Sequence, residues 1–349
     1  MRLTFFSRNA PSLLGAFLLP ALFLFPSCEK KSTTPPWEGE TVSAESVAKT
    51  KQSETKETAP KKEETPKPSD QKPARKGSVR FVAYNLENWL TMDRYVDRKP
   101  AGSTPKPEEE REAVIAILKD AQPDILGVCE IGTKEDLADL QQRLKVAGID
   151  LPYSFHTGGG DEVRHLGMLS RFPITSTSVP EDLTYELGDR TRTMGRGILD
   201  AKIDSPAGEL HFLGTHLKSK REIPDGDQEM MRRAEAHLLR READRILSDN
   251  PDTQLIVYGD MNDTRQTSAI RTIQGPRDGP KSLKMAHLRD SHGESWTHFW
   301  SYQDVYSRFD YILMSPPLVS KIAWDDSRVL DGESWSKASD HRAHLLIIE

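Results

Sequence analysis

Cysteine is nearly absent from this sequence, and its N-terminal apolar run is too short to cross a membrane. The chain has two cysteines, Cys28 and Cys129, among 349 residues. The apolar stretch at residues 11–25 is 15 residues long, whereas a membrane-spanning helix needs roughly 20. After residue 77 only Cys129 remains, so that part of the chain has no internal disulfide and must be stabilised by packing.

A surplus of basic residues is also missing. The whole chain has a formal net charge of −6, from 48 Lys+Arg and 54 Asp+Glu. Residues 1–77 hold 13 Lys+Arg and 9 Asp+Glu, which leaves 35 and 45 for the remainder, a formal charge of −10. No bulk basic surface for non-specific duplex binding is evident. Part of the negative charge is suited to holding cations.

The first 28 residues have the pattern of a signal peptide. Arg2 and Arg8 precede the apolar stretch, and Ser27 and Cys28 follow it, which matches a basic region, an apolar region and a small residue at a cleavage point. Cys28 makes the segment resemble a bacterial lipoprotein signal, although Phe25 and Pro26 depart from the usual residues there. We expect export to the cell envelope, with a lipid anchor at Cys28 or, alternatively, simple cleavage and secretion.

The composition of residues 29–77 predicts a disordered tether, and the length of residues 78–349 predicts one large domain. The tether is rich in Lys, Glu, Thr, Ser and Pro, with Trp37 as its only aromatic residue, so it cannot bury enough apolar surface to order itself. A flexible chain of this length spans roughly 40 Å. The remaining 272 residues suffice for a substantial core.

Apolar runs predict the strands of this domain, and period-3.6 patterns predict its helices. Six clear strands are expected at 79–86, 124–130, 210–217, 254–260, 309–315 and 343–349, with weaker candidates at 166–172 and 197–203. Helices are expected over 108–119 and 227–247.

Polar side chains stand at the edges of the predicted strands. Asn85, Glu130 and His216 close the first three, and Asp260 with Asn262 closes the fourth. By contrast, Asp310 stands near the start of the fifth run, and Asp340 and His341 directly precede the sixth. All of these converge on one site only if the later strands run antiparallel to their neighbours. The pattern therefore favours mixed sheets over a doubly wound parallel sheet.

These motifs resemble one known superfamily. "YNLEN", "VCE", "THLKS", "GDMNDT", "RFDYIL" and "SDH" occur in this order, and each is similar to a motif of the endonuclease/exonuclease/phosphatase superfamily. That group includes pancreatic-type deoxyribonucleases, apurinic endonucleases, sphingomyelinases and inositol-polyphosphate phosphatases. The resemblance implies an α/β fold, a four-layer α/β/β/α sandwich of two mixed β-sheets flanked by helices.

The resemblance also implies a metal-dependent reaction at phosphate esters. A divalent cation polarises the anionic ester and stabilises the charge that gathers on its oxygens. Oxygen donors such as Glu130 and Asn85 suit Mg²⁺, with Mn²⁺ as a substitute. The family pattern makes Glu130 the principal metal ligand, with Asn85 beside it and Asp340 as a contributor.

The remaining candidate residues handle water, protons and phosphate. Asp260 and Asn262 are two apart, so both side chains of an extended segment point to the same side. The resemblance implies that Asp260 orients the attacking water and that Asn262 contacts the phosphate or Asp260 itself. Asp263 is expected to be a loop residue. The resemblance also pairs Asp310 with His341, which acts as base or transition-state stabiliser.

Two further residues are expected at the phosphate. His216 matches a second histidine of the secreted-nuclease and sphingomyelinase branches. Arg196 resembles a phosphate-contacting arginine, and a guanidinium suits that contact. Arg190 and Arg192 are nearby competitors for the same role.

We therefore predict a divalent-metal-dependent phosphoesterase, foremost a secreted or surface-tethered endonuclease or phosphodiesterase acting on nucleic acid. The alternatives are a phosphatase or phospholipase-type esterase on lipid head groups or sugar phosphates, and an inactive surface binding protein. The sequence predicts no protein partner.

Overall fold

The computed structural model describes residues 77–96, 99–224 and 226–349. The predicted signal peptide and nearly all of the predicted tether lie outside these residues. No helix in the described part of the chain is long and apolar enough to span a membrane.

One mixed sheet contains the N-terminal strand of the domain at its centre. Its strands, in spatial order, are β17 (Arg328–Val329), β18 (His344–Ile348), β1 (Val79–Trp89), β4 (Ile125–Ile131), β6 (His165–Ser170) and β5 (Tyr153–Thr157). β1 is parallel to β4 but antiparallel to β18, and β4 is antiparallel to β6.

The second sheet is also mixed. Its order is β13 (Lys284–Met285), β16 (Asp310–Met314), β12 (Leu255–Asp260), β11 (Gly208–His216), β10 (Ile198–Ser205) and β7 (Ile174–Ser178). β11 and β12 are parallel, whereas β16 is antiparallel to β12. The six clear strands that apolar runs predicted all form, and the antiparallel placement of β16 and β18 confirms the inference of mixed sheets.

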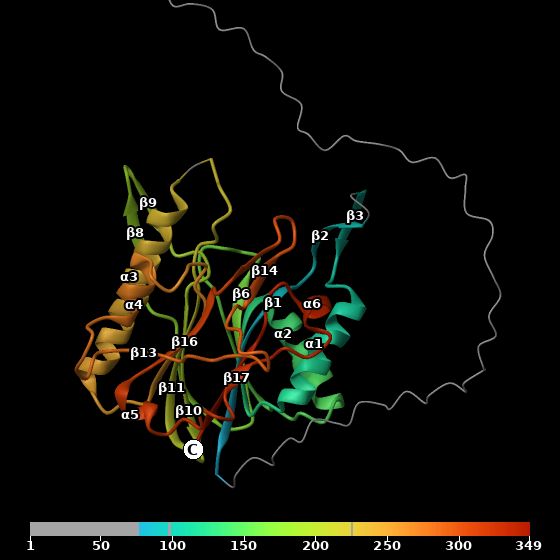
Figure 1. The fold of residues 1–349 in the computed structure, drawn as a ribbon. Coiled ribbons are helices and arrows are strands. Elements are labelled where there is room, and N and C mark those ends of the chain that lie inside the picture. Colours follow the sequence, from blue (N-terminus) through green and yellow to red (C-terminus); the bar gives the residue numbers. More distant parts are fainter. Residues whose placement is uncertain (1–76, 97–98, 225) are drawn as a thin grey trace, which may run out of the picture. The chain divides into compact units, whose positions relative to one another are not determined.

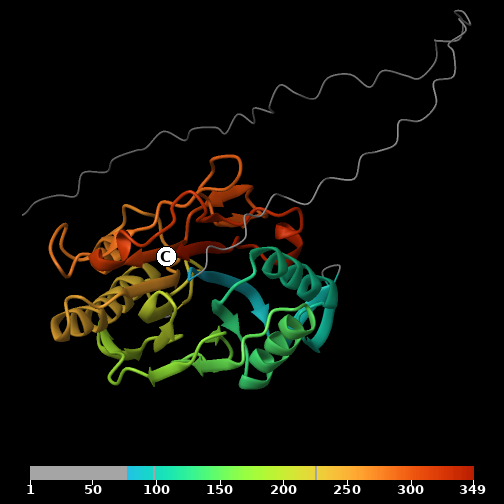
Figure 2. The same ribbon diagram turned by 90° about the horizontal axis from the view of Figure 1, so that it is seen from below.

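Helices cover the outer face of each sheet. α1 (Glu108–Ala121), α2 (Lys134–Val146) and α6 (Trp335–Ala338) lie on one side, and α3 (Gln228–Asp249) and α4 (Ser268–Gln274) lie on the other (Figures 1 and 2). A short helix, α5 (Pro316–Val319), follows β16. The four-layer sandwich is therefore confirmed.

The local sequence explains the two long helices at the sandwich surfaces. α1 buries the predicted apolar face, which includes Val114, Ile117 and Leu118, and it ends at Gln122 in a left-handed conformation. α3 begins at Asp227, whose side chain accepts hydrogen bonds from the backbone N–H groups of Glu229 and Met230. Such caps satisfy the free N–H groups of a first turn.

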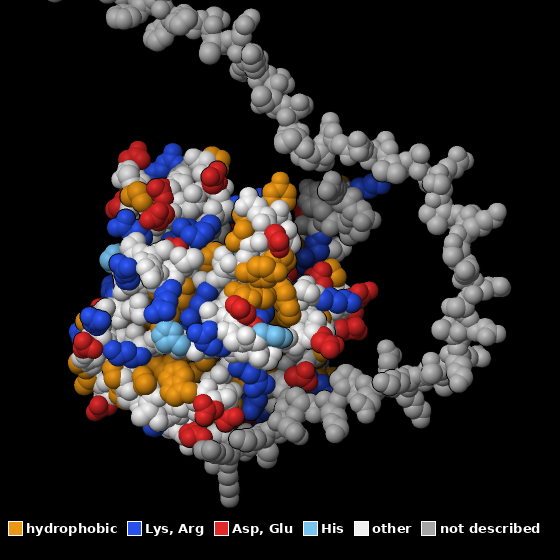
Figure 3. Space-filling view, in the orientation of Figure 1, with side chains coloured by type: hydrophobic (Ala, Val, Ile, Leu, Met, Phe, Trp, Pro, Cys, Tyr) orange, Lys and Arg blue, Asp and Glu red, His pale blue; other side chains and the backbone are white. Residues whose placement is uncertain are grey.

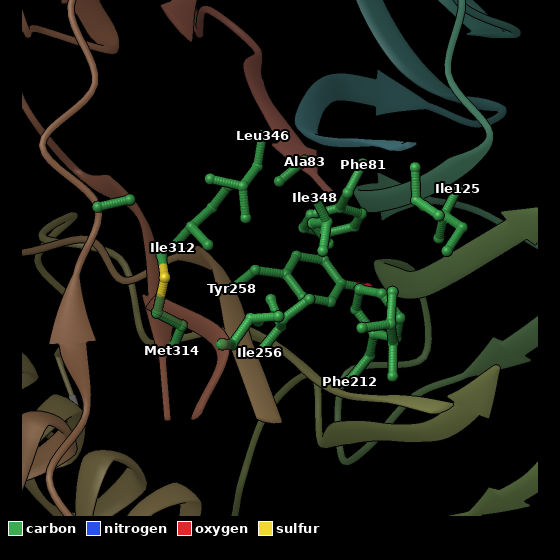
Figure 4. Close-up of a cluster of buried hydrophobic side chains, with 14 of the residues drawn as sticks. Phe81, Ala83, Ile125, Phe212, Ile256, Tyr258, Ile312, Met314, Leu346 and Ile348 are labelled. Carbon is green, nitrogen blue, oxygen red and sulfur yellow. The ribbon is translucent and has the colours of Figure 1, made fainter. Parts of the chain in front are cut away.

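An aromatic cluster fills the space between the sheets (Figure 4). Phe81, Phe212 and Tyr258 are each at most 1% exposed, and the Phe81 ring centroid lies 4.9 Å from that of Phe212 and 5.0 Å from that of Tyr258. The Tyr258 ring lies so close to Gly127 of β4 and Gly214 of β11 that a Cβ at either position would collide with it. Burying side chains of this size contributes about 1.5–3 kcal/mol each.

Three short hairpins were not predicted. They are β2 (Met92–Val96) with β3 (Lys99–Thr104), β8 (Thr184–Leu187) with β9 (Arg190–Thr193), and β14 (His298–Trp300) with β15 (Val305–Ser307). Their strands have three to six residues and lie mostly at the surface, so no buried apolar run marks them.

One core histidine makes the fold sensitive to acid. His344 on β18 is 1% exposed, and neither ring nitrogen has a hydrogen-bond partner within the described residues. Burial, together with Arg308 and Arg342, lowers its pKa from 6.5 to about 3, against an opposing effect of Asp310. An imidazolium at this position therefore costs free energy.

We expect His344→Leu to reduce the acid sensitivity of the protein. Between about pH 6.5 and pH 3 the unfolded chain binds a proton at His344 and the folded chain does not, so the free energy of unfolding falls as the pH falls. By pH 4.5 the resulting loss in the free energy of unfolding amounts to roughly 2–3 kcal/mol. Urea unfolding at pH 7 and pH 4.5 measures it, with the exposed His237→Leu as control. Equal losses in wild type and His344→Leu would contradict the assignment.

Candidate active site

The strand pairing places the predicted site residues at one end of the sandwich. Asn85 pairs with Cys129, next to Glu130, in the β1–β4 ladder. Asp260 on β12 pairs with His216 on one side and with Asp310 on the other. Neighbouring strand ends therefore supply most of the candidate side chains.

An unusual backbone holds the Asn85 and Glu130 side chains. Glu87, Asn88 and Glu130 all have positive φ values, of 47°, 62° and 60°, a conformation that costs non-glycine residues free energy and often marks functional sites. The Glu87 N–H donates to Asn85 Oδ1 over 3.1 Å, and the Asn88 N–H donates to Glu130 Oε2 over 3.0 Å. The strained turn thus fixes both predicted metal ligands.

Asn85 turns its amide nitrogen toward the carboxylates. Nδ2 lies 3.1 Å from Asp260 Oδ2 and 3.5 Å from Glu130 Oε1, while Oδ1 accepts from Glu87. In this arrangement Asn85 acts as a donor that orients two acids. Its role as a metal ligand remains a prediction.

Asp260 lies at the centre of the cluster. It is 2% exposed, and its Oδ2 lies 3.5 Å from His216 Nε2 and 3.6 Å from His341 Nε2. Burial raises its pKa to about 7, assisted by Asp310 and Glu130 and opposed by His341. A carboxyl group with such a pKa is suited to exchange a proton with water near neutral pH.

Asn262 holds the Asp260 carboxylate from one side. Its backbone N–H donates to Asp260 Oδ1 over 2.8 Å, and its Nδ2 donates to Asp260 Oδ2 and to the Leu217 carbonyl, each over 3.1 Å. Gly259 has a φ of 133° and lies so close to the Thr215 carbonyl that a side chain would not fit. Only glycine therefore permits this approach of β12 to β11.

Asp263 belongs to the loop as predicted, but it is buried. It is 2% exposed, with Lys220 Nζ 2.8 Å and Arg232 Nε 3.4 Å from its carboxylate oxygens. These cations lower its pKa against the effect of burial. Asp263 thus anchors the loop after β12.

Asp310 and His341 form the predicted pair. His341 Nδ1 lies 2.7 Å from Asp310 Oδ2, and both residues are nearly buried, with 5% and 6% exposure. Burial favours the neutral ring, but Asp310, Asp260 and Asp340 outweigh it and raise the His341 pKa well above its usual value. These carboxylates favour the imidazolium form of His341, whose Nε2 lies 3.6 Å from Asp260 Oδ2.

His216 has the opposite protonation state. It is 2% exposed, and Nδ1 has no hydrogen-bond partner within the described residues. Its Nε2 lies 3.9 Å from Glu130 Oε1. Burial, followed by Arg196 and His341, lowers its pKa well below the usual value. His216 is thus a neutral imidazole beside two acids.

Arg196 lies next to this cluster, held by the glycine-rich loop. It is 9% exposed, and its Nε lies 3.4 Å from Asp161 Oδ2. The loop is fixed by hydrogen bonds from the Gly160 and Asp161 N–H groups to the Met194 and Gly195 carbonyls. The same loop brings Arg164 Nε to 3.9 Å from Glu130 Oε2.

Asp340 lies between two imidazoles. Its Oδ1 is 3.9 Å from His341 Nε2, and its Oδ2 is 3.7 Å from His298 Nε2. The His298 ring centroid lies 4.7 Å from that of His341, and the ring stacks on Phe309 at 5.1 Å. Burial opposes the negative charge on Asp340, but His341 and His298 lower its pKa.

Several residues of the site were missed from the sequence. They are Glu87, Asp161, Arg164, Glu235 and His298. Glu235 is 1% exposed on α3 and accepts hydrogen bonds from the Gly195 and Lys218 N–H groups over 3.2 and 2.6 Å. Two of these residues carry a signal in the sequence. Glu235 is a carboxylate on the buried face of a helix, and His298 is a histidine within an aromatic run.

The donor set fits a divalent cation. Asp260, Asp310 and His341 offer ligand atoms that lie within 4.8 Å of one another, but His341 Nδ1 is engaged with Asp310, so the carboxylates are the donors that suit a cation. The pKa of Asp260 shows that its negative charge lacks compensation in this arrangement. Carboxylate oxygens are the ligands that Mg²⁺ and Mn²⁺ prefer. Glu130 and Asp260 both lie near His216 Nε2, at 3.9 Å and 3.5 Å, and the role of Glu130 as principal metal ligand remains a prediction.

The sandwich and its carboxylate–imidazole site define a phosphoester hydrolase. The sequence model of the Endonuclease/Exonuclease/phosphatase family matches residues 101–341, more than half of the chain. The chain therefore belongs to this family, as the motifs predicted. Every predicted site residue except Asn85 lies within the matched stretch. No curated protein sequence matches the chain.

Solved structures share the fold at low sequence identity. An endonuclease/exonuclease/phosphatase from Bacteroides vulgatus is 19% identical with a TM-score of 0.54, covering 78% of this chain and 98% of its own. The human nocturnin catalytic domain with bound sulfate is 18% identical with a TM-score of 0.54, covering 79% and 96%. Truncated TDP2 from Caenorhabditis elegans is 18% identical with a TM-score of 0.53, covering 79% and 99%.

Proposed function

We propose that the protein is a divalent-metal-dependent phosphodiesterase that cleaves nucleic acid as an endonuclease, exported to the cell envelope. The observation that carries this proposal is the position of the Asp260 carboxylate, 3.5 Å from a neutral imidazole and 3.6 Å from a protonated one. This arrangement supplies a proton acceptor, an uncharged donor and a cation within one buried cluster.

The reaction requires one water molecule and no covalent enzyme intermediate. The water oxygen attacks phosphorus in line with the leaving oxygen, and the phosphorus–oxygen bond to that oxygen breaks. Asp260 orients the water and accepts its proton, which its pKa of about 7 permits. Asn85 and Asn262 hold the carboxylate for this step through their Nδ2 groups.

Charge that develops on the phosphate requires cationic partners. His341 is held protonated by Asp310, so it stabilises the transition-state oxygens by donating from Nε2. Glu130 and its neighbours would hold a divalent cation, which would supply Lewis-acid polarisation of the phosphate. His216, whose lowered pKa favours the neutral ring, donates a hydrogen bond to the phosphate, and the leaving oxygen takes its proton from water.

Basic side chains near the site support an anionic polymer as substrate. Arg164 and Arg196 lie beside Glu130 and His216, and the pKa of Lys218 is lowered by burial and by Arg196. Cationic side chains thus lie at the site, each beside a carboxylate, although the domain is acidic overall. Export through the predicted signal peptide, with a lipid anchor at Cys28 or release, would place the enzyme where extracellular nucleic acid is found.

An activity panel tests the proposal. Full-length protein is incubated with plasmid DNA, RNA, a chromogenic phosphodiester, a phosphomonoester and sphingomyelin, in Mg²⁺, Mn²⁺ or EDTA. We expect hydrolysis of DNA or RNA and of the phosphodiester, with EDTA lowering the rate about 100-fold or more. Hydrolysis of only the phosphomonoester or sphingomyelin would favour the alternative esterase. Equal rates in EDTA and Mg²⁺ would reject the metal dependence.

A further inference from the structure

An exposed aromatic pair lies at the tip of the β14–β15 hairpin. Trp300 is 47% exposed and Tyr302 is 85% exposed, with ring centroids 6.1 Å apart. Figure 3 shows hydrophobic side chains gathered over the position of β14 in Figure 1, with Lys and Arg side chains beside them. Val305 and Tyr306 of the same hairpin are 41% and 52% exposed, and contiguous exposed apolar patches often mark a surface that meets a ligand.

The hairpin is joined directly to the catalytic loop. The Phe299 N–H donates to the Asp340 carbonyl over 2.9 Å, and His298 forms a β-bridge with His341. His298 and Trp300 are two residues apart on β14, so their side chains share one face of the strand. Because His298 contacts His341 and Asp340 on that face, Trp300 stands roughly 7 Å further along, at the edge of the site.

The opposite face of the hairpin carries an aromatic cluster. The Tyr306 ring stacks on Phe299 at 4.4 Å and meets Trp296 at 4.8 Å, and Trp296 in turn meets Trp335 at 5.0 Å. The Arg342 guanidinium lies 3.4 Å from the Trp296 ring centroid. These contacts join the base of the hairpin to the rest of the domain, although Tyr306 itself is 52% exposed.

Basic side chains lie next to the hairpin. Lys220, which pairs with Asp263, lies 5.8 Å from the Phe309 ring centroid, and the Phe309 ring stacks on His298. Lys218 neighbours Arg196 and Glu235. A ligand bound at the hairpin therefore meets both aromatic faces and cations.

We infer that Trp300 and Tyr302 form a stacking surface for an unpaired base next to the scissile phosphate, so that the enzyme prefers single-stranded over duplex nucleic acid. This inference rests on the proposed function. Every base has a π-face that stacks on aromatic rings, whereas bases in a duplex are already stacked on their neighbours. The domain has a formal net charge of −10, which disfavours non-specific binding to a duplex backbone.

The polarity of the tip favours a base over a lipid surface. The turn is Ser301-Tyr302-Gln303-Asp304, and Asp304 has a φ of 55°. It holds an acid and no Lys, Arg or aliphatic residue, whereas segments that insert into membrane interfaces combine apolar and basic residues.

Binding measurements in EDTA test the inference without hydrolysis. Full-length protein is titrated with a fluorescent 12-residue oligothymidylate, a duplex of the same length and a 12-residue abasic strand that has the phosphates but no bases. The variants are the double variant Trp300→Ala/Tyr302→Ala, the conservative Trp300→Phe, and Trp324→Ala, which removes a tryptophan that is 42% exposed elsewhere on the surface.

We expect the double variant to raise the Kd for oligothymidylate at least tenfold, the range that loss of a stacked base produces. The Kd of Trp300→Phe should stay within about threefold of the wild-type value, and the Kd of Trp324→Ala should equal the wild-type value. Wild type should bind the abasic strand and the duplex at least tenfold more weakly than oligothymidylate.

Three results would overturn the inference. They are unchanged oligothymidylate binding in the double variant, equal binding of the abasic strand by wild type, and equal binding of the duplex by wild type. The proposed function fails separately: if no nucleic acid is hydrolysed in Mg²⁺ or Mn²⁺ yet oligothymidylate binding depends on Trp300, the stacking surface stands and the nuclease assignment falls.

Discussion

Replacing Asp260 by asparagine is expected to lower kcat for phosphodiester hydrolysis about 1,000-fold or more without destabilising the protein. The substitution keeps the shape of the side chain but removes the proton acceptor that faces His216 and His341. Loss of a positioned general base or acid typically costs 100- to 10,000-fold. The chemistry therefore depends on the charge, not on the volume, at this position.

The stability of Asp260→Asn separates a catalytic role from a structural one. The pKa of Asp260 is raised by burial and by neighbouring carboxyl groups, so its ionised form is unfavourable in the metal-free folded protein. Removing that charge is expected to leave the melting temperature unchanged or to raise it, which is a common property of active-site substitutions. A fall in melting temperature that parallels the fall in kcat would contradict this expectation.

Asp263 provides a matched control three residues away. It is equally buried at 2%, but Lys220 and Arg232 lower its pKa, so its charge stabilises the fold. Asp263→Asn should lower the free energy of unfolding by roughly 1–2 kcal/mol, less than for a fully buried pair because Lys220 is half exposed. It should leave kcat within a few-fold of wild type.

The fold was predictable from the sequence because its central strands are buried. Runs such as 79–86 and 254–260 are apolar at nearly every position and lie in the middle of a sheet. The mixed strand directions followed from one requirement, that Asp310 and His341 reach the same site as Asp260. The hairpins were not predictable, since β8–β9 and β14–β15 depend on turns and on packing between distant segments.

The site was predictable where strand ends supply it and not where loops or helices do. Asn85, Glu130, His216, Asp260 and Asp310 lie at strand edges, so a strand pattern locates them. His298 reaches Asp340 only because the β14–β15 hairpin folds back over the catalytic loop. Glu235 reaches Gly195 only because α3 packs on the second sheet. Sequence spacing holds no information about either contact.

Removing the His341 imidazole is expected to be at least as damaging as removing the Asp260 charge. His341→Ala should lower kcat about 1,000- to 10,000-fold, because the ring is the protonated group that faces Asp260. Asp310→Asn should cause a large part of the same loss, since Asp310 holds the ring at Nδ1 over 2.7 Å. The effects of substituting residues that act as a unit are strongly non-additive.

The double variant Asp310→Asn/His341→Ala decides whether the two residues form one unit. We expect its kcat to equal that of His341→Ala within a few-fold, because without the imidazole Asp310 has no group left to orient. Losses that multiply would assign Asp310 an independent contact with substrate or metal and reject the pair. Steady-state rates on the chromogenic phosphodiester measure all three variants, and their circular dichroism shows whether each is folded.

A second buried dyad in the same domain provides the structural control. His211 Nε2 lies 2.6 Å from Asp200 Oδ1, and both residues are 5% exposed, as is His341. The other carboxylate oxygen, Asp200 Oδ2, lies 3.3 Å from a guanidinium nitrogen of Arg245 and contacts no catalytic group among the residues that the structure describes. Asp200→Asn and His211→Ala should therefore lower stability and leave kcat within a few-fold of wild type. If they lowered kcat as much as the His341 variants, the loss would reflect the disturbance of any buried Asp–His pair, and the catalytic assignment of His341 would fail.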